Sequence, residues 1–338
     1  MTKLFIISNE SVFSYDGKFF CDNIDMKSTP EGLNKDFEVN IIARKSKKKR
    51  SHKIELLNVK IYKNIFLFLL GVLKTIKKED SKYLIFSITP FTLLASILIK
   101  IFKKKSIVYL RSDGFGEYKS IFGLIGPIIF SFMFFVVSKI STLVSCNKYI
   151  LHGKKGEIVL PSQLDDLWLA NINKPTLEKN KLLFVGRIKK EKGIYSLIDI
   201  LKSNNQLNNL TIVGAENKIN KENFKNINII EIIKNKKELI DLYDEHNIFV
   251  LPSYTEGHPM VLLESLARLR PVIVFDEINH VAKNKKGVFV SSRNADSFFK
   301  KIDYIMNNYD KIQSEMKKNI LPENKQFISD LKRIIVNL

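Results

Sequence analysis

The sequence predicts an α/β protein built from two Rossmann-like domains. Short apolar runs, typical of buried parallel strands, alternate with helix-like segments along the chain. The alternation loosens between Lys148 and Asn180, and a second series of the same kind begins at Lys181. We therefore predict a first domain in residues 1–165, a second in residues 175–320, and a C-terminal helix in residues 321–338 that can pack back on the first domain.

The predicted strands are rich in the β-branched and aromatic side chains that strands prefer. In the first domain they are Leu4–Ser8, Val39–Ala43, Tyr83–Ser87, Ile107–Arg111 and Thr142–Ser145. In the second they are Leu182–Val185, Leu210–Val213, Ile227–Ile230, Ile248–Leu251, Val272–Phe275 and, at the edge, Gly287–Val290. Helices are predicted at Tyr195–Lys202, Lys236–Tyr243 and Pro259–Leu269, and along the amphipathic tail from Ala295.

The formal net charge is +20, and most of it lies in the first half, where residues 1–175 carry 28 Lys and Arg against 15 Asp and Glu. A basic surface suits nucleic acid, an anionic membrane or solubility alone, and basic clusters beside apolar segments favour the membrane. The tract Lys45–Lys53 is predicted to be a surface loop. A nucleic-acid site is not favoured there, because no aromatic platform or known binding motif surrounds the tract. The two cysteines, Cys21 and Cys146, have no metal-ligand spacing and predict no disulfide framework.

Three apolar runs in the first half adjoin lysines or lack charge altogether. Ile65–Leu73 and Phe91–Phe102 each end in a lysine cluster, whereas Ser120–Ser138 contains no charged residue. The last run is long enough to cross a membrane, although two glycines and a proline interrupt its first third. A spanning helix, a core helix and a helix docked in the membrane plane all remain open, and the last two are compatible.

The stretch Phe249–Val274 holds the first candidate binding site. It reads as strand, loop, helix and strand, and ligands of parallel sheets sit beyond the carboxyl ends of the strands, where this loop lies. Glu256 precedes the helix and Glu264 lies along it, with seven residues between them. The exposed N–H groups predicted from His258 through Val261 suit a phosphate, and a carboxylate near such a helix can accept hydrogen bonds from a ribose. The alternative is a helix with two solvated glutamates.

The stretch Leu182–Gly193 holds the second candidate site and is again strand, loop and helix start. Gly186 allows a tight turn where the strand ends. Arg187 offers a planar fork for phosphate oxygens, and Lys192 adds a compact charge at the head of the next helix. Both cations are predicted to face the ligand at the carboxyl edge of the sheet.

With both stretches in view, the sequence resembles glycosyltransferase family 4, which comprises retaining enzymes of the GT-B fold. The matching motifs are FVGRIKKEKG, then IVGAEN at Ile212–Asn217, then LPSYTEGHPMVLLESLARLRPVIV, in the order and separations of the family. The resemblance implies a GT-B architecture of two facing Rossmann-like domains with parallel sheets and an inter-domain cleft. In the first domain it rests only on the α/β alternation.

The resemblance implies a role for each residue of these motifs. Arg187 and Lys192 would bind the diphosphate of a nucleotide-sugar donor, Glu256 would lie at the sugar, and Glu264 at the ribose. The remaining donor-site residues would form the turns and the helix start over the donor: Gly186, Gly214, Gly257, His258, Pro259, Met260 and Val261. No Asp-x-Asp triplet occurs, and the family is metal-independent, so the resemblance implies neither a metal nor another cofactor.

The first domain departs from the family pattern. Where members often carry a Gly-Gly turn after the first strand, this chain has SNESVFSYDG with the single Gly17. Where many carry a histidine after a middle strand, this chain has Arg111 and Asp113, which become the acceptor-side candidates; an internal salt bridge between the two is the alternative. His152 and His280 have no motif around them and are predicted to be structural or exposed.

We therefore expect a retaining glycosyltransferase that uses a nucleotide-sugar donor. The basic, apolar first domain predicts a lipid-linked or surface-polysaccharide acceptor and peripheral association with the cytoplasmic face of the plasma membrane. Nucleic acid is not expected as a partner. The alternative function is a basic protein that binds nucleic acid or a membrane surface and retains a degenerate nucleotide-sugar site.

Overall fold

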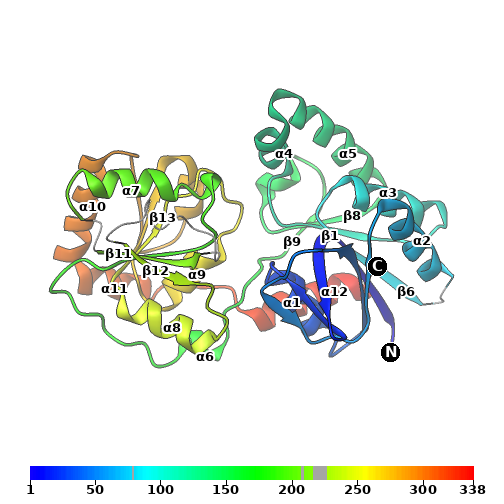
Figure 1. Cartoon of the computed structure of the whole chain (residues 1–338), viewed down its shortest axis with the longest axis horizontal. Helices are drawn as coiled ribbons and strands as arrows, with labels where there is room; N and C mark the ends of the chain where they lie inside the picture. Colours follow the sequence, from blue (N-terminus) through cyan, green and yellow to red (C-terminus); the bar gives the residue numbers. More distant parts are fainter. Residues whose placement is uncertain (78–79, 207–208, 216–226) are drawn as a thin grey trace. The chain divides into compact units, whose positions relative to one another are not determined.

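The computed structural model describes residues 1–77, 80–206, 209–215 and 227–338. The chain forms two compact units (Figure 1): unit 1 comprises Met1–Pro161 and Lys325–Leu338, and unit 2 comprises Ser162–Asn324. Each unit is an α/β fold around a parallel sheet, as the sequence predicts. The C-terminal segment belongs to unit 1 and contributes Phe327 and Leu331 to its core.

The sheet of unit 1 has β1 at its centre. Its parallel strands lie in the order β5-β3-β1-β6-β7-β8-β9. The chain therefore starts at the central strand β1, forms β3 and β5 on one side of it, and then forms β6 to β9 on the other side. This is the doubly wound arrangement, in which a switch point lies beside the first strand, here between β1 and β6. The strands are β1 (Lys3–Tyr15), β2 (Lys18–Cys21), β3 (Glu38–Lys45), β4 (His52–Ile54), β5 (Val59–Tyr62), β6 (Ser81–Phe86), β7 (Ile107–Leu110), β8 (Thr142–Ser145) and β9 (Glu157–Ile158).

Helices cover both faces of this sheet. On one face α2 (Ile65–Ile76), α3 (Pro90–Ile101) and α5 (Gly126–Ile140) pack on the strands through residues such as Phe68, Ile99 and Phe134. On the other face lie α1 (Asp25–Leu33) and α12 (Asn324–Val336). The alternating strand pattern explains the two cores, because successive side chains of a strand point to opposite faces.

The N-terminal strand extends further than the sequence predicts. β1 continues to Tyr15, and Asp16 and Gly17, both with positive φ, turn the chain into the antiparallel strand β2, which pairs in turn with β4. An Asp-Gly pair is the preferred two-residue hairpin turn, because both central residues need φ > 0. The segment that replaces the family's Gly-Gly turn is therefore a β-hairpin.

The longest apolar run forms a helical hairpin, not one straight helix. α4 (Gly114–Phe122) ends at Gly123, whose φ is +63, and after a short 3-10 turn α5 begins at Gly126. The rings of Phe115 and Phe130 lie 4.9 Å apart, so α4 packs back against α5. A side chain on Gly126 would overlap the backbone of Tyr118, which explains the glycine at this crossing.

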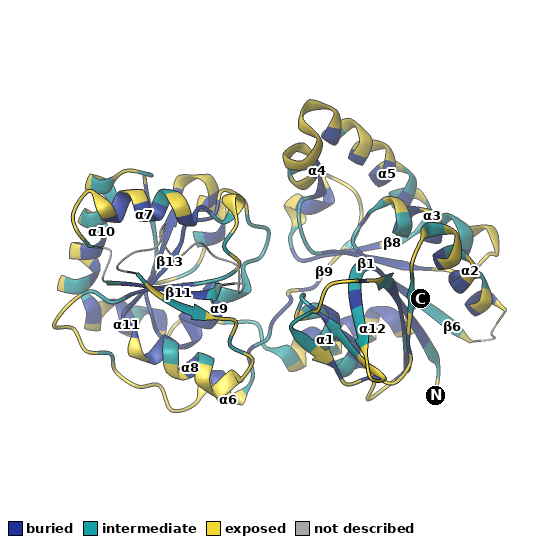
Figure 2. Ribbon diagram, viewed as in Figure 1, coloured by how far each residue is buried: buried dark blue, intermediate teal, exposed yellow. Residues whose placement is uncertain are grey.

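The whole stretch Gly114–Ile140 is long and apolar enough to cross a membrane, but only 28% of its most apolar window is buried in the protein. α5 alone has 15 residues, which span about 22 Å against a hydrocarbon core of about 30 Å. The outer surfaces of α4 and α5 are exposed (Figure 2). Exposed apolar side chains include Leu124 (85%), Ile128 (70%) and Phe132 (66%).

Unit 2 has a six-stranded parallel sheet in the order β12-β11-β10-β13-β14-β15, again the doubly wound order, with its switch point between β10 and β13. The strands are β10 (Leu182–Val185), β11 (Leu210–Ala215), β12 (Asn228–Glu231), β13 (Ile248–Leu251), β14 (Val272–Phe275) and β15 (Val288–Ser291). α7 and α10 lie on one side of the sheet, and α8 and α9 on the other (Figure 1). The helices are α6 (Asp166–Leu169), α7 (Ile194–Lys202), α8 (Lys236–Glu245), α9 (Met260–Ala267), α10 (Ala295–Asn307) and α11 (Tyr309–Met316).

Two buried arginines fix the start of unit 2. Arg268 and Arg270, each 1% exposed, share the carboxylate of Asp244. Arg268 also donates to the backbone oxygens of Trp168, Ala170 and Asn171, and Arg270 to that of Asn173. A guanidinium can be buried only when its donors are satisfied, so this network holds residues 168–173 against the unit.

The chain enters and leaves unit 2 at one point. The backbone N–H of Asn324 donates to the oxygen of Leu164 at 2.8 Å, and its side-chain amide donates to the oxygen of Ser162 at 2.9 Å. The first and last residues of unit 2 are therefore joined by hydrogen bonds.

Candidate donor site in unit 2

The two predicted binding stretches meet at the switch point of unit 2. β10 and β13 are neighbouring parallel strands, with Leu182 opposite Ile248. Their carboxyl ends therefore lie at the same edge of the sheet, and the loops that follow them, 186–193 and 252–259, lie side by side. Ligands of doubly wound sheets bind in this position, because the chain leaves the two strands in opposite directions and opens a crevice there.

An ion pair joins the two loops. Lys192 Nζ lies 2.6 Å from Oε1 of Glu256, and the hydroxyl of Ser253 donates to the same oxygen at 2.7 Å. The Lys192 and Glu256 side chains are 26% and 11% exposed, so solvent screens this pair only in part. The structure thus brings together one predicted cation and one predicted carboxylate.

The backbones of the two loops also lie close together. The N–H of Tyr254 donates to the oxygen of Glu191 at 3.0 Å. Gly193, whose φ is +66, packs so closely that a side chain would overlap the carbonyl oxygen of Pro252. Only glycine combines this φ with this contact, so Gly193 fixes the spacing between the loops.

A second pair of glycines lies where β10 and β11 end. The N–H of Gly186 donates to the oxygen of Val213 at 2.9 Å, and a Cβ on Gly214 would lie 2.6 Å from the oxygen of Gly186. Gly214 has a φ of +105, which favours glycine. The two predicted glycines are thus in contact; the last two residues of the Ile212–Asn217 motif lie outside the described residues.

The helix start that follows Glu256 has no side-chain cap. α9 begins at Met260 after Pro259, and no capping side chain accepts a hydrogen bond from its first-turn N–H groups. Such N–H groups carry the positive end of the helix dipole and can receive an anion. Gly257, His258, Pro259, Met260 and Val261 are all partly exposed, so this end of the helix is open to solvent.

Glu264 is buried within α9. It is 8% exposed, and its Oε2 accepts a hydrogen bond from the hydroxyl of Tyr243 at 3.0 Å. Burial raises the pKa of the Glu264 carboxyl to about 7, and the Tyr243 bond opposes that rise. The alternative of two solvated glutamates is therefore wrong for Glu264, because its side chain is buried and hydrogen-bonded to Tyr243 of α8.

Arg187 lies in the turn after β10, at the same sheet edge as Lys192, and is exposed. Within the described part of the chain its guanidinium makes no ion pair. It is therefore available to a ligand, although the structure does not place it against Glu256.

Two residues at this site carried no sequence signal. Arg293, which follows β15, stacks its guanidinium 4.1 Å from the ring centre of Tyr254 and donates to the hydroxyl of Ser196 at 2.7 Å. His280 Nε2 lies 2.8 Å from the backbone oxygen of Glu256. Both side chains contact the Glu256 loop. They belong to segments that follow this loop in the sequence, and only the fold of the sheet brings these segments close to it.

The acceptor-side candidates lie in unit 1, directly after β7. Arg111 pairs with Asp25 at 3.5 Å and stacks on the ring of Phe86, whereas Asp113 caps α4 and lies 3.2 Å from Nε2 of His152. The salt bridge between Arg111 and Asp113 is therefore not formed, since the Asp113 oxygens receive the N–H groups of the first turn of α4. Asp113 has a capping role that the sequence did not reveal.

Among the residues described, no three His, Cys, Asp or Glu side chains are grouped so that they could hold a metal ion. The cations and the open helix start at the Lys192–Glu256 loops are instead suited to an anionic ligand.

The fold of the chain is similar to that of solved structures. Its structure is similar to that of Anabaena HepE in complex with UDP, with a TM-score of 0.71 and 11% identity over 100% of both chains. This likeness confirms the predicted α/β GT-B architecture with two parallel sheets.

The sequence comparisons then report similar proteins. The family model "Glycosyl transferases group 1" matches residues 169–321, which lie within unit 2. The chain is 31% identical over 160 residues to the capsular polysaccharide biosynthesis glycosyltransferase CapM of Staphylococcus aureus, covering 43% of this chain and 42% of that one. It is 23% identical over 181 residues to the N,N'-diacetylbacillosaminyl-diphospho-undecaprenol alpha-1,3-N-acetylgalactosaminyltransferase of Campylobacter jejuni, covering 50% of this chain and 46% of that one. The chain thus matches about half of the length of these curated relatives.

Proposed function

We propose that the protein is a retaining, metal-independent glycosyltransferase that transfers a sugar from a nucleoside-diphosphate sugar to an acceptor hydroxyl. One observation carries the proposal: Lys192 and Glu256 meet at the switch point of the unit 2 sheet, beside an uncapped helix start. A cation and free N–H groups suit the diphosphate, and the neighbouring carboxylate suits the hydroxyls of the sugar.

Each donor-site residue then has a part in binding. Arg187, Lys192 and the first turn of α9 receive the diphosphate, and Glu256 meets the sugar. Glu264 accepts hydrogen bonds from the ribose, which requires that its carboxyl turn away from Tyr243 or share its second oxygen. Gly186 and Gly214 keep side chains out of the space near the base.

The acceptor hydroxyl attacks the sugar from the face that the diphosphate leaves, and the leaving phosphate takes the hydroxyl proton. Charge develops on the leaving diphosphate, so Lys192, Arg187 and the dipole of α9 stabilise the transition state more than the ground state. No covalent nucleophile is required, and positioning supplies the rest of the rate.

We propose a lipid-linked or surface-polysaccharide acceptor. The relatives from S. aureus and C. jejuni are named for capsular polysaccharide and for a diphospho-undecaprenol glycan. The apolar outer surfaces of α4 and α5, with lysines at their ends, would dock unit 1 on the anionic cytoplasmic face of the plasma membrane. This docking is peripheral, because α5 is shorter than the hydrocarbon core.

Thermal unfolding of the purified protein with UDP-, GDP-, ADP- and TDP-sugars tests the donor site. A ligand that binds the folded state raises the unfolding temperature by mass action. We expect a rise with one nucleotide class, reduced in Arg187→Ala and Glu264→Gln. Lys189→Ala, which removes an exposed lysine from the same loop, is the matched control and should keep the full rise. A folded protein that responds to none of the nucleotide sugars would refute the proposal.

A further inference from the structure

Unit 1 has an open pocket at the carboxyl edge of its sheet, where β3 and β5 end. Its volume is about 580 Å³. The pocket is bordered by the β1–β2 hairpin turn, the ends of β3 and β5, and the first turn of α2. The lining residues include Asp16, Phe19, Lys45, Tyr62, Lys63 and Leu67.

One wall of this pocket is apolar and held in place by packing. The ring of Tyr62 lies against Gly71 of α2, where a side chain would overlap it, and edge-on to Phe68 at 6.3 Å. Tyr62 is partly buried, and this burial raises the pKa of its hydroxyl further above the physiological range. Together with Phe19 and Leu67, this wall suits a hydrocarbon chain.

The rim of the pocket is cationic. Lys45 and Lys63 line it against a single acid, Asp16, and both lysines are exposed. In the part of the chain that the structure describes, neither lysine forms an ion pair. Lysine ammonium groups in such a position suit a phosphate.

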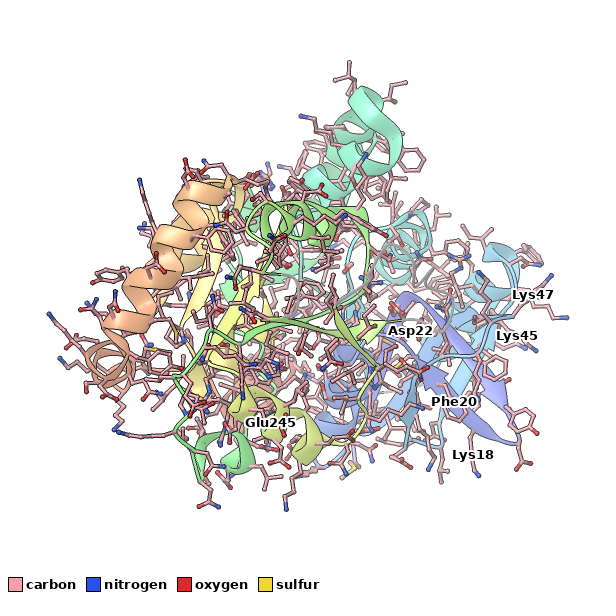
Figure 3. The ribbon with its side chains drawn as sticks, turned by 60° about the vertical axis from the view of Figure 1, so that its left-hand side comes forward. Lys18, Phe20, Asp22, Lys45, Lys47 and Glu245 are labelled. Carbon is pink, nitrogen blue, oxygen red and sulfur yellow. The ribbon has the colours of Figure 1, made fainter. Side chains whose placement is uncertain are left out.

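The basic tract Lys45–Lys53 adds to this charge; it is a loop only between Lys45, the last residue of β3, and His52, the first of β4, so the predicted loop is shorter than the tract. Ser46 is buried, with its hydroxyl 3.1 Å from both the N–H of Lys48 and Nε of Arg50, and Arg50 pairs with Asp22. These bonds hold the loop, while Lys47, Lys48 and Lys49 stay exposed. Lys45 and Lys47 lie near each other on unit 1 (Figure 3).

The apolar wall continues onto the outer surface of α2. Leu67 lines the pocket and is 42% exposed, and its helix neighbours Phe66 and Leu70 are 68% and 37% exposed. A ligand with its anionic group at Lys45 and Lys63 could therefore extend a hydrocarbon chain along α2 without leaving apolar surface. A nucleic acid or a free sugar phosphate would leave this surface uncovered.

We infer that this pocket binds the phosphate group of a long-chain phosphorylated lipid, with the chain against Tyr62, Leu67 and the outer face of α2. The inference extends the proposed function and depends on it, because the bound lipid phosphate would be that of the proposed lipid-linked acceptor. The pocket would bring the lipid phosphate to the carboxyl edge of the unit 1 sheet, where Arg111 also lies.

Calorimetric titration with decyl phosphate, below the concentration at which it forms micelles, tests the inference without donor or turnover. Inorganic phosphate presents the head without the chain, and decyl maltoside presents the chain without the charge. We expect decyl phosphate to bind at least tenfold more tightly than either. The double variant Lys45→Ala/Lys63→Ala should weaken the binding of decyl phosphate roughly tenfold. Each partly exposed ion pair with the phosphate contributes up to about threefold, and two such pairs together make about tenfold.

The matched control is Lys154→Ala/Lys155→Ala. It removes the same charge just before β9, the strand at the side of the sheet away from the pocket, and should bind decyl phosphate as the unchanged protein does. Leu67→Ser should weaken decyl phosphate but not inorganic phosphate, whereas Leu94→Ser, a leucine of similar exposure on α3, should change neither. Equal weakening by both lysine pairs, or equal binding of inorganic phosphate, would overturn the inference. If the protein binds decyl phosphate but no nucleotide sugar, the lipid-phosphate pocket is supported and the proposed donor site is refuted.

Discussion

Lys192 Nζ lies 2.6 Å from Oε1 of Glu256, although 64 residues separate the two in the sequence. Each comes from the loop after one of two adjacent parallel strands, so the sheet alone makes them neighbours. In the structure the two charges neutralise each other. A diphosphate that binds Lys192 would compete for this ammonium and free a carboxylate oxygen for the sugar.

Replacing Lys192 tests this arrangement in the reaction. We expect Lys192→Ala to lower kcat/KM by about 10²-fold, because it removes a cation from the group on which charge develops. Release of the nucleoside diphosphate measures the rate. Lys189→Ala, in the same loop, should change kcat/KM less than twofold, since Lys189 pairs only loosely with Glu191 at 3.8 Å. Equal losses in the two variants would point to general charge and away from a specific role.

The buried carboxyl of Glu264 should make the stability of the protein depend on pH. Its folded-state pKa is raised from 4.5 to about 7, so the folded state holds the proton more tightly than the unfolded state does. The stabilisation is full below pH 4.5 and is lost as the pH rises through 7, with a total change of about 3 kcal/mol.

Urea unfolding at pH 5 and pH 8 checks this dependence. Glu264→Gln cannot titrate there, so its free energy of unfolding should fall less between the two values than that of the unchanged protein. Tyr243→Phe removes the hydrogen bond that opposes the rise, so it should move the loss to higher pH. Parallel pH profiles for the unchanged protein and Glu264→Gln would contradict the prediction.

Gly193 should tolerate no side chain. Gly193→Ala combines a positive φ, which costs about 1 kcal/mol, with an overlap on the carbonyl of Pro252. We expect it to lower the free energy of unfolding by more than 2 kcal/mol and to abolish donor binding, both measurable by urea and thermal unfolding. Gly153→Ala has a similar φ of +76 but open space around it, so it should cost only the backbone term. A Gly193→Ala variant no less stable than Gly153→Ala would show that the loops can separate freely.

The exposed helical hairpin should control membrane binding. Phe132, 66% exposed on α5, would enter the lipid interface, so Phe132→Glu should reduce partition onto anionic vesicles at least tenfold in co-sedimentation. Val336→Glu is the control, because Val336 is 55% exposed on α12, which covers the opposite face of the sheet. Equal sedimentation of both variants would place the membrane contact elsewhere.

Much of unit 2 was predictable because its central strands β10, β13 and β14 are buried. Leu182–Val185, Ile248–Leu251 and Val272–Phe275 have the bounds that the sequence predicts, since parallel strands covered on both faces read as unbroken apolar runs. Their loops carry the motifs, so the sequence also located the sheet edge where Lys192 and Glu256 meet.

What the sequence could not provide depends on contacts between distant segments. β2 and β4 have only four and three residues and are partly exposed, so no long apolar run marks them and only the Asp16–Gly17 pair signals the hairpin. The partner of Arg111 is Asp25, 86 residues away, and Tyr243 reaches Glu264 from another helix. Arg293 and His280 support the Glu256 loop only because β13, β14 and β15 lie in that order.

The bonds of Asn324 to Ser162 and Leu164 give the chain a topology with consequences for synthesis. Unit 2 is an insertion into unit 1, so the ribosome completes all of unit 2 before α12 emerges. α12 supplies Phe327, Leu331 and Ile335 to the core of unit 1, which therefore stays open on that face until α12 has been synthesised. Unit 2 can fold as soon as it is made, whereas unit 1, although begun first, is the last to close.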